Sequence, residues 1–489
     1  MRIRFLLVVL LCSSMVFAQS LEEQFRKFSQ DAQQRYSDFR ATANKQYADF
    51  MRQTWDYYKM SPAFTQPDEK KVPPVVYEEP IQANQASQQV AVSETIPYAE
   101  VEPLPEPAPA PQPIAPIEEN QQKSAVYTFS YFGTQFKFRY PEHVGISLTD
   151  LEENTLADVW ERMSGEAFNN LIRDCILVRD VYQLCDWAYL MMLQQLSETI
   201  YGKTNEAVLL QAFIYSQSGY AMRLAKKDNR LYLLIGSKYQ LYNVNYFEFD
   251  DSYFYALGAS GEDGFYICKG KFDSEQPLDL RIRSEQAFAA DMVRVPMRTS
   301  KMAISASCVV NSNLIDFYNA YPTGTFGNNI GSRWAAYANA PVEESVRQTL
   351  YPTLQTAIDG QTEKQAVTRL LNWVQTAFTY KYDDDVWGYD RAFFPSETLY
   401  YPYADCEERS ILLSRIIRDL LGLDVILVYY PGHLATAVGF NEDVSGEYLM
   451  YNGRKYVVCD PTFVGAPIGK SMPGMDNQQA LVISLSSVL

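Results

Sequence analysis

One stretch near the C-terminal end constrains the fold more than any other part of the chain. It begins at Cys406, in the sequence ADCEERSILL, and continues with apolar residues that recur near the helical period. Gly422 then acts as a helix stop, and an apolar run rich in β-branched residues follows at Val425 to Val428. Two more strands are expected, at Leu434 to Phe440 and at Lys455 to Cys459. This order of one helix and three strands predicts an α+β domain.

Three chemically reactive side chains stand at the ends of these elements. Cys406 opens the helix, His433 precedes the second strand, and Asp460 follows the third. A helix N-terminus and a neighbouring imidazolium favour a thiolate, and a histidine can take and return the proton. A carboxylate holds the imidazole in one tautomer. We therefore predict a nucleophilic triad of Cys406, His433 and Asp460. The alternative is a buried cysteine, a turn histidine and a strand-end aspartate without chemistry.

The motifs around these residues resemble those of the transglutaminase-like superfamily, a group of papain-like thiol enzymes. ADCEERSILL, PGHLATAV and CDPTF agree with the family in identity, order and spacing, over roughly residues 360–465 or about a fifth of the chain. The resemblance implies a papain-like core, with a helix bundle and an antiparallel sheet. It also implies that Cys406, His433 and Asp460 occupy the catalytic positions.

The chain departs from the family pattern at the oxyanion hole. No upstream glutamine of the papain kind is evident, and tyrosines stand in its place. The candidate side-chain donors are Tyr400, Tyr401, Tyr403 and Trp387. The backbone N–H of the nucleophilic cysteine is the donor that needs no further assumption.

Acidic residues surround the expected nucleophile. Glu407 and Glu408 oppose ionisation of the thiol, so we expect its activation to come mainly from His433. The aromatic and acidic stretch from Tyr380 to Tyr403 either lines a substrate cleft or covers the thiol helix. No cysteine or histidine spacing predicts a zinc site, and no calcium-binding loop is evident, so neither metal nor cofactor is expected.

Two classes of function fit these features. The first is acyl transfer through a Cys406 thioester to a protein or peptide amide, with water as acceptor in a peptidase or amidase, or an amine in a transglutaminase. The second is a non-catalytic binding or assembly protein of the cell envelope that retains a vestigial triad. The net charge of −17 excludes neither, but it argues against nucleic-acid binding.

The first 18 residues are typical of a secretory signal peptide. Two arginines precede the apolar run Phe5 to Leu11, and Val16-Phe17-Ala18 fits a cleavage site. The run is too short to span a bilayer, and no later stretch is apolar enough to do so. We therefore expect an exported protein, periplasmic or secreted, without a transmembrane segment. The bulky leucine before Cys12 argues against a lipoprotein.

Export permits disulfides. Cys175 and Cys185 are the closest pair and could bridge two successive helices, and a pairing of Cys268 with Cys308 is a weaker alternative.

Two unusual segments precede the globular part. Residues 19–60 carry aromatic residues every 11 positions, which predicts one long helix with its apolar stripe on one face. This helix could associate with itself or dock on a partner through residues 21–59. Residues 61–123 hold 13 of the 25 prolines and predict an extended, semi-rigid spacer.

The globular part is expected to form two domains, at residues 124–320 and 321–489. Residues 165–270 repeat the C-terminal order of helices and strands, with Asn205 in the place of Cys406. We interpret them as a degenerate copy of the transglutaminase-like core, inert because an amide is not a nucleophile. The alternative is an unrelated helix followed by a β-meander. Residues 321–339 are expected to form a loop near the site.

Overall fold

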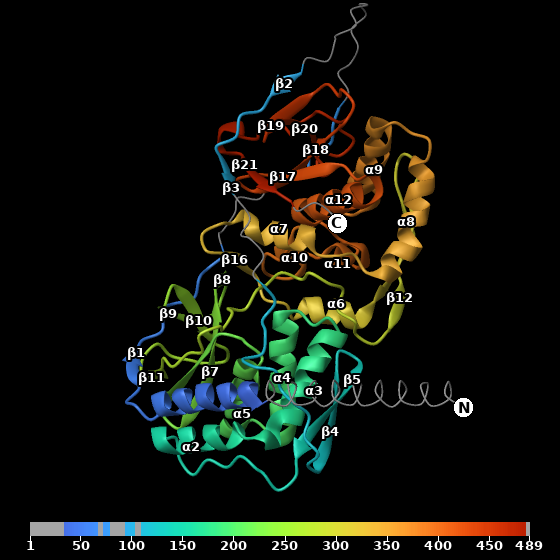
Figure 1. The fold of residues 1–489 in the computed structure, drawn as a ribbon. Helices are drawn as coiled ribbons and strands as arrows, with labels where there is room; N and C mark the ends of the chain where they lie inside the picture. The colour runs from blue at the N-terminus through green and yellow to red at the C-terminus, as the bar shows by residue number, and fades with distance from the viewer. Residues whose placement is uncertain (1–33, 67–71, 79–92, 103–108, 486–489) are drawn as a thin grey trace, which may run out of the picture.

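The protein is described here by a computed structural model that covers residues 34–66, 72–78, 93–102 and 109–485. Two units stand one above the other in Figure 1, the lower in cyan and green and the upper in orange and red. Each unit packs helices against one mainly antiparallel sheet, with six strands in the first unit and seven in the second. The α+β class predicted from the sequence is confirmed.

The first unit combines four helices, a hairpin and the six-stranded sheet. Its helices are α2 (Glu153–Met163), α3 (Asn169–Val181), α4 (Asp186–Tyr201) and α5 (Asn205–Gln217), and its hairpin joins β4 (Ser124–Tyr131) to β5 (Thr134–Pro141). The sheet contains β1 (Asp56–Tyr58), β6 (Met222–Lys227), β7 (Arg230–Ser237), β9 (Tyr246–Phe249), β10 (Ser252–Ala256) and β11 (Phe265–Cys268). Helix α5 is almost entirely buried because it lies between α4 and the sheet.

The second unit surrounds the helix that begins at Cys406. Its helices are α7 (Gly331–Asn339), α8 (Glu344–Ile358), α9 (Glu363–Ala377), α10 (Asp383–Val386), α11 (Pro395–Tyr400) and α12 (Cys406–Leu421). Its sheet contains β2 (Glu94–Thr95), β3 (Glu100–Glu102), β17 (Asp424–Tyr430), β18 (His433–Gly439), β19 (Glu447–Tyr451), β20 (Arg454–Cys459) and β21 (Leu481–Ser484). The apolar stripe of α12 is buried from Ile411 to Ile417, because α12 packs against β18 on one side and against α7 and α9 on others.

Short elements connect the two units. Strand β8 (Tyr239–Leu241) pairs with β16 (Gly324–Phe326), and four short strands precede α6 (Ser312–Asn319). These strands are β12 (Met292–Arg294), β13 (Arg298–Thr299), β14 (Ser305–Ala306) and β15 (Val309–Asn311).

The two sheets share one strand order. The strands that follow α12 lie side by side as β21-β17-β18-β20-β19. Those that follow α5 lie as β11-β6-β7-β10-β9, with β8 left out of the sheet. All of these neighbours are antiparallel in both units. This common topology supports the interpretation of residues 165–270 as a second version of the C-terminal core.

The N-terminal helix is shorter than predicted and is docked on the first unit. Its described part runs from residue 34 to residue 51, and the chain then turns into β1, which pairs with β11. Tyr47 stacks on Phe272 at 4.9 Å between ring centroids, while Phe39 remains exposed. A continuous helix to residue 60 is therefore wrong, and part of the aromatic stripe serves intramolecular packing. The predicted residues before 34, including the signal peptide, lie outside the described residues.

The proline-rich segment is a strap that contacts both units, not a free spacer. Its first residues pair with the first unit, where Phe64 stacks on Tyr246 at 4.3 Å. Strands β2 and β3 then pair in parallel with β19 and β21, at the two edges of the second sheet. The chain returns to the first unit, where the Ile114 N–H donates to the Gln217 carbonyl. The prolines of this segment lie outside both strands, which read Glu-Thr and Glu-Val-Glu, so none of them interrupts the pairing.

The expected loop at residues 321–339 is wrong in its second half. Glycine and asparagine residues form a turn as far as residue 330, but α7 follows. Trp334 and its neighbours are buried because α7 packs against α12 and β21. Helical packing therefore outweighs the loop-like composition.

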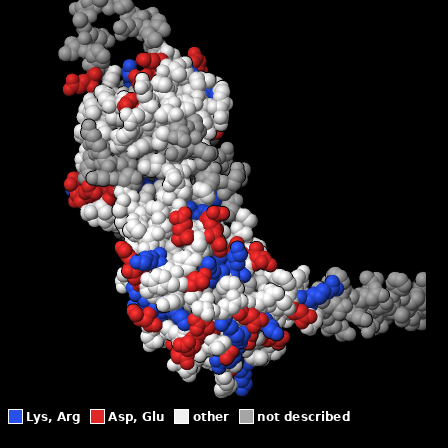
Figure 2. All heavy atoms as spheres, turned by 90° about the vertical axis from the view of Figure 1, so that its left-hand side faces the viewer, with Lys and Arg blue, Asp and Glu red and all other residues white. Residues whose placement is uncertain are grey.

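Charge is mixed over the surface of the first unit. Figure 2 shows acidic and basic side chains interspersed over the lower unit, whereas the upper unit is mostly white on this face. No continuous basic patch is visible among the described residues on this face.

Across the residues that the structure covers, no helix has both the length and the apolar character that crossing a membrane requires.

The docking of the N-terminal helix depends on Asn44, which is fully buried. Its Oδ1 accepts from the Trp160 indole N–H at 3.1 Å and from the Gln217 amide at 2.9 Å. We predict that Asn44→Leu lowers the free energy of unfolding by about 2–4 kcal/mol, because two buried donors lose their acceptor. Urea unfolding measures this. The exposed Phe39→Ala should change it by less than about 0.5 kcal/mol. An equal effect of both variants contradicts the prediction.

Candidate active site

The capping box of α12 fixes Cys406 at the first helical position. The Asp405 side chain accepts from the Glu407 N–H at 3.0 Å, and the Glu408 carboxylate accepts from the Asp405 N–H at 2.7 Å. The helix ends at Gly422, whose φ of 63° is the left-handed conformation that favours glycine. The glycine stop was predicted from the sequence, whereas the capping box was not. As a result, the thiol stands at the positive end of the helix dipole.

A clamp on Leu434 holds the first turn of α12 against β18. The Leu434 N–H lies near the Cys406 sulfur and lowers the pKa of its thiol. One turn later, the Ser410 hydroxyl donates to the Leu434 carbonyl at 2.8 Å. Leu434 directly follows His433, so the clamp brings the thiol beside the start of the strand that carries the histidine.

His433, which directly precedes Leu434, forms a buried pair with Asp460. The His433 Nε2 lies 2.8 Å from the Asp460 Oδ2, and their exposed fractions are 2% and 3%. The Nδ1 of His433 is buried and has no hydrogen-bond partner. Strands β18 and β20 are neighbours in the sheet, which is why the two residues meet. The three residues of the predicted triad therefore lie around one point of the fold.

The loop after Asp460 is tied down by Gln375, a residue that sequence reasoning missed. Its amide donates to the carbonyls of Asp460, Phe463 and Ala466 at 2.9–3.2 Å, and its Oε1 accepts from the Gly465 N–H. Asp460 itself accepts backbone N–H groups of this loop through Oδ1. Gln375 is buried in α9, and its position within an amphipathic helix gave no signal of this role.

Carboxylates around Cys406 disfavour its ionisation. Burial, then Asp405 and Glu407, raise the pKa of the Cys406 thiol well above its usual value, and the Leu434 N–H only partly offsets them. Glu407 is itself paired with Arg333, at 2.7 Å. The sequence expectation that the neighbouring glutamates oppose a thiolate agrees with this direction.

Three buried carboxyl groups lie under the thiol. Oxygen atoms of Asp383, Asp405 and Glu408 all lie within 4.8 Å of one another. Burial is the largest cause that raises the pKa of each, and Glu408 shares a hydrogen bond with Asp405. Among the described residues this is the group that could hold a metal ion, although protons shared between the carboxyls also accommodate such proximity.

The structure points to a different oxyanion-hole candidate from those expected. Tyr401 donates to Asn319, and Lys381 lies over the Tyr403 ring at 4.1 Å. Trp387 packs edge-to-face against Tyr401, and so does Tyr400. None of these four residues shows an interaction with Cys406 in the described chain.

Tyr380 is the tyrosine on which the Cys406 thiol acts electrostatically. Burial is the largest cause that raises the pKa of Tyr380 above its usual value, and the charge of Cys406 is the second. The Arg409 guanidinium lies 5.3 Å from its ring centroid and donates to the Phe378 carbonyl, which fixes this corner. The sequence offered Tyr380 only as part of an aromatic stretch.

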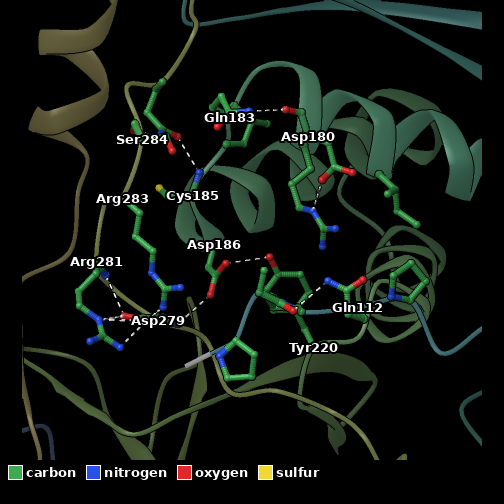
Figure 3. A pocket seen from close by; sticks show the side chains of 18 of the residues that line it. Gln112, Asp180, Gln183, Cys185, Asp186, Tyr220, Asp279, Arg281, Arg283 and Ser284 are labelled. Carbon is green, nitrogen blue, oxygen red and sulfur yellow. Dashed lines mark hydrogen bonds and ion pairs between the residues drawn. The ribbon is translucent and has the colours of Figure 1, made fainter. Parts of the chain in front are cut away.

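The first unit contains a hollow of about 590 Å³ beside the α3–α4 turn, shown in Figure 3. Burial raises the pKa of Asp186 to about 6, and this carboxylate accepts from the Tyr220 hydroxyl at 2.9 Å. Arg281 and Arg283 both converge on Asp279. Three arginines and three aspartates line this hollow, so its formal charges balance.

The predicted disulfides are absent from the described cysteines. Cys175, Cys185, Cys268 and Cys308 are all free thiols. Cys175 lies in the core side of α3, whereas Cys185 stands at the start of α4 on the wall of the hollow in Figure 3. Cys175 and Cys185 are therefore close in sequence but do not form a disulfide.

No family model matches the chain, and no curated protein is significantly similar to it.

The role of Gln375 can be tested by stability. We predict that Gln375→Leu lowers the free energy of unfolding by about 2–4 kcal/mol, because buried carbonyls and one N–H lose their partner. Hydrogen exchange at Gly465 should also accelerate. The exposed Gln361→Leu, in the α8–α9 turn, should leave both measurements unchanged. Wild-type exchange at Gly465 in the Gln375 variant contradicts the assignment.

The electrostatic effect of Glu407 can be tested on the thiol. We predict that Glu407→Gln lowers the pKa of Cys406, because it removes a neighbouring negative charge that disfavours the thiolate. The pH midpoint of Cys406 alkylation by iodoacetamide, followed by peptide mass, should therefore move to lower pH. Glu118→Gln, on the surface of the first unit, is the control. A midpoint that stays in place or rises contradicts the prediction.

Proposed function

We propose that the protein is an exported thiol enzyme of the transglutaminase-like class, with a papain-like core in its second unit. Its reaction would be acyl transfer from a protein or peptide amide through a Cys406 thioester. The observation that carries this proposal is the clamp on Leu434, which holds the thiol beside His433 while Asp460 occupies the far nitrogen of the imidazole. The proposal is argued from the geometry of the site and from the sequence motifs, since no family model matches the chain.

The proposed reaction uses the unpartnered nitrogen of His433. The Cys406 sulfur attacks the amide carbonyl while the thiol proton passes to the His433 Nδ1, and a carbon–sulfur bond forms. The imidazolium is stabilised by Asp460 and returns its proton to the leaving amine as the carbon–nitrogen bond breaks. A thioester remains on Cys406. Water or a second amine then attacks it and regenerates the thiol.

The negative charge on the substrate oxygen needs a donor. The Cys406 N–H lies at the first helical position, where the backbone donor has no acceptor within the helix. The hydroxyl of Tyr380, whose pKa the charge of Cys406 raises, is the candidate side-chain donor.

The raised pKa of Cys406 shapes this mechanism. A thiol that is protonated at rest requires His433 to act as a general base during the attack, in contrast to a preformed thiolate–imidazolium pair. Hydrolysis and transfer to an amine remain two alternatives for the second step.

The second candidate function is a non-catalytic binding or assembly role in the cell envelope. The observation that favours it is the ring of carboxyl groups around Cys406, which acts against a reactive thiol. In this alternative, the buried His433–Asp460 pair serves packing, and the strap that contacts both units serves assembly.

A generic acyl donor separates the two candidates. We predict that p-nitrophenyl acetate transfers one acetyl group to Cys406, detected by the mass of the peptide that contains it. His433→Ala should slow this acylation by about 100-fold or more, because it removes the general base. His143→Ala is the matched control, since His143 is the other histidine of the chain and its side chain is 93% exposed. Equal rates in wild type and His433→Ala would falsify the enzymatic proposal and support the binding role.

A further inference from the structure

The first unit repeats the clamp of the second unit at the corresponding place. Asn205 is the first residue of α5, as Cys406 is of α12. The Leu231 N–H donates to the Asn205 Oδ1 at 2.9 Å. The Leu434 N–H has the corresponding position near the Cys406 sulfur, where it lowers the pKa of the thiol. Leu231 and Leu434 are each the second residue of the strand that follows a two-residue turn.

The other two positions of the triad also have counterparts. Arg230 begins β7, as His433 begins β18. The pairing of β10 with β7 can be continued for two residues past the end of β10, as far as Gly258. In the second sheet, the pairing of β20 with β18 gives Asp460 the corresponding position. The first unit therefore presents asparagine, arginine and glycine where the second presents cysteine, histidine and aspartate. It has neither a nucleophile nor a general base at this point.

A hollow of about 340 Å³ opens at this same point of the first unit. All three counterpart residues line it, together with Lys203 and Thr204 before α5. Its remaining walls come from α4 and from the sheet (Figure 1). A space therefore remains at the position of the active site even though the catalytic groups are missing.

The lining of this hollow has a polar mouth and an apolar floor. Lys203 and Arg230 are exposed at the mouth, and neither forms an ion pair with any residue that the structure describes. The carboxylate of the lining, Glu198, accepts from Gln194 at 2.9 Å. The floor is formed by apolar side chains, among them Val208, Leu233, Ile235 and Leu257. A ligand that carries one anionic group next to an apolar side chain fits this arrangement.

We propose that this hollow is a non-catalytic binding site for the C-terminal end of a peptide. The terminal carboxylate would lie between Lys203 and Arg230, and the last side chain would rest on Val208 and Leu233. The choice of a peptide rests on the proposed function, because the corresponding site of the second unit would bind one. The first unit would then hold the end of a chain that the second unit acts on.

Binding can be measured independently of catalysis in the full chain carrying Cys406→Ala. The probes are acetylated tripeptides Ala-Ala-X with X as Leu, Ile, Val or Phe, each with a free carboxylate and as the C-terminal amide. Isothermal titration should show binding of at least one acid, with its amide at least about 10-fold weaker. Arg230→Gln and Lys203→Gln should each weaken the acid by about 10-fold, because a charge-assisted contact is lost. Arg162→Gln, an exposed arginine on α2, is the matched control and should have no effect.

Three outcomes overturn the proposal. They are no binding of any acid at millimolar concentration, equal binding of acid and amide, and binding that neither Arg230→Gln nor Lys203→Gln weakens. Because the titration uses a chain without the Cys406 thiol, its result is independent of acylation. A failure of the binding site and a failure of the catalytic proposal can therefore be distinguished.

Discussion

The contacts of Leu434 with the first turn of α12 determine the geometry of the candidate site. They hold the N-terminus of a helix and the start of a strand in register, so a residue at the first helical position meets a residue at the first strand position. The rest of the site is built outward from this contact. Asp460 reaches His433 because β20 is the neighbour of β18, and Gln375 then holds the loop that carries Asp460.

The first unit has the same helix–strand contact without a cysteine at the start of its helix. Asn205 keeps the contact to the backbone of β7 through an amide oxygen, and its Nδ2 donates to the Asn229 carbonyl at 3.1 Å. An asparagine side chain can form hydrogen bonds on both sides of the turn, because it has an acceptor and a donor. A cysteine contacts one side only and leaves its thiol available for reaction. The same topology can therefore support either a structural corner or a nucleophile, depending on one side chain.

Local signals in the sequence were sufficient for the elements around the site. The capping residues before Cys406, the glycine after α12 and the β-branched run of β17 each act over a few residues, so their outcome does not depend on distant partners. The role of Gln375, the helix α7 and the strap could not be predicted in this way. Each depends on which distant backbone lies opposite, and residue composition favoured a loop at 321–339 and a spacer at 61–123.

The strap gives the molecule an unusual order of assembly. Strand β2 pairs with β19, which lies about 350 residues later in the chain, and β3 pairs with β21 near the other end. During synthesis, both edge strands leave the ribosome long before the sheet that receives them exists. Pairings of such high sequence separation form slowly, because a long loop must close first. The second sheet therefore has two open edges until the oldest part of the chain covers them, and open edges are where strands of different molecules pair.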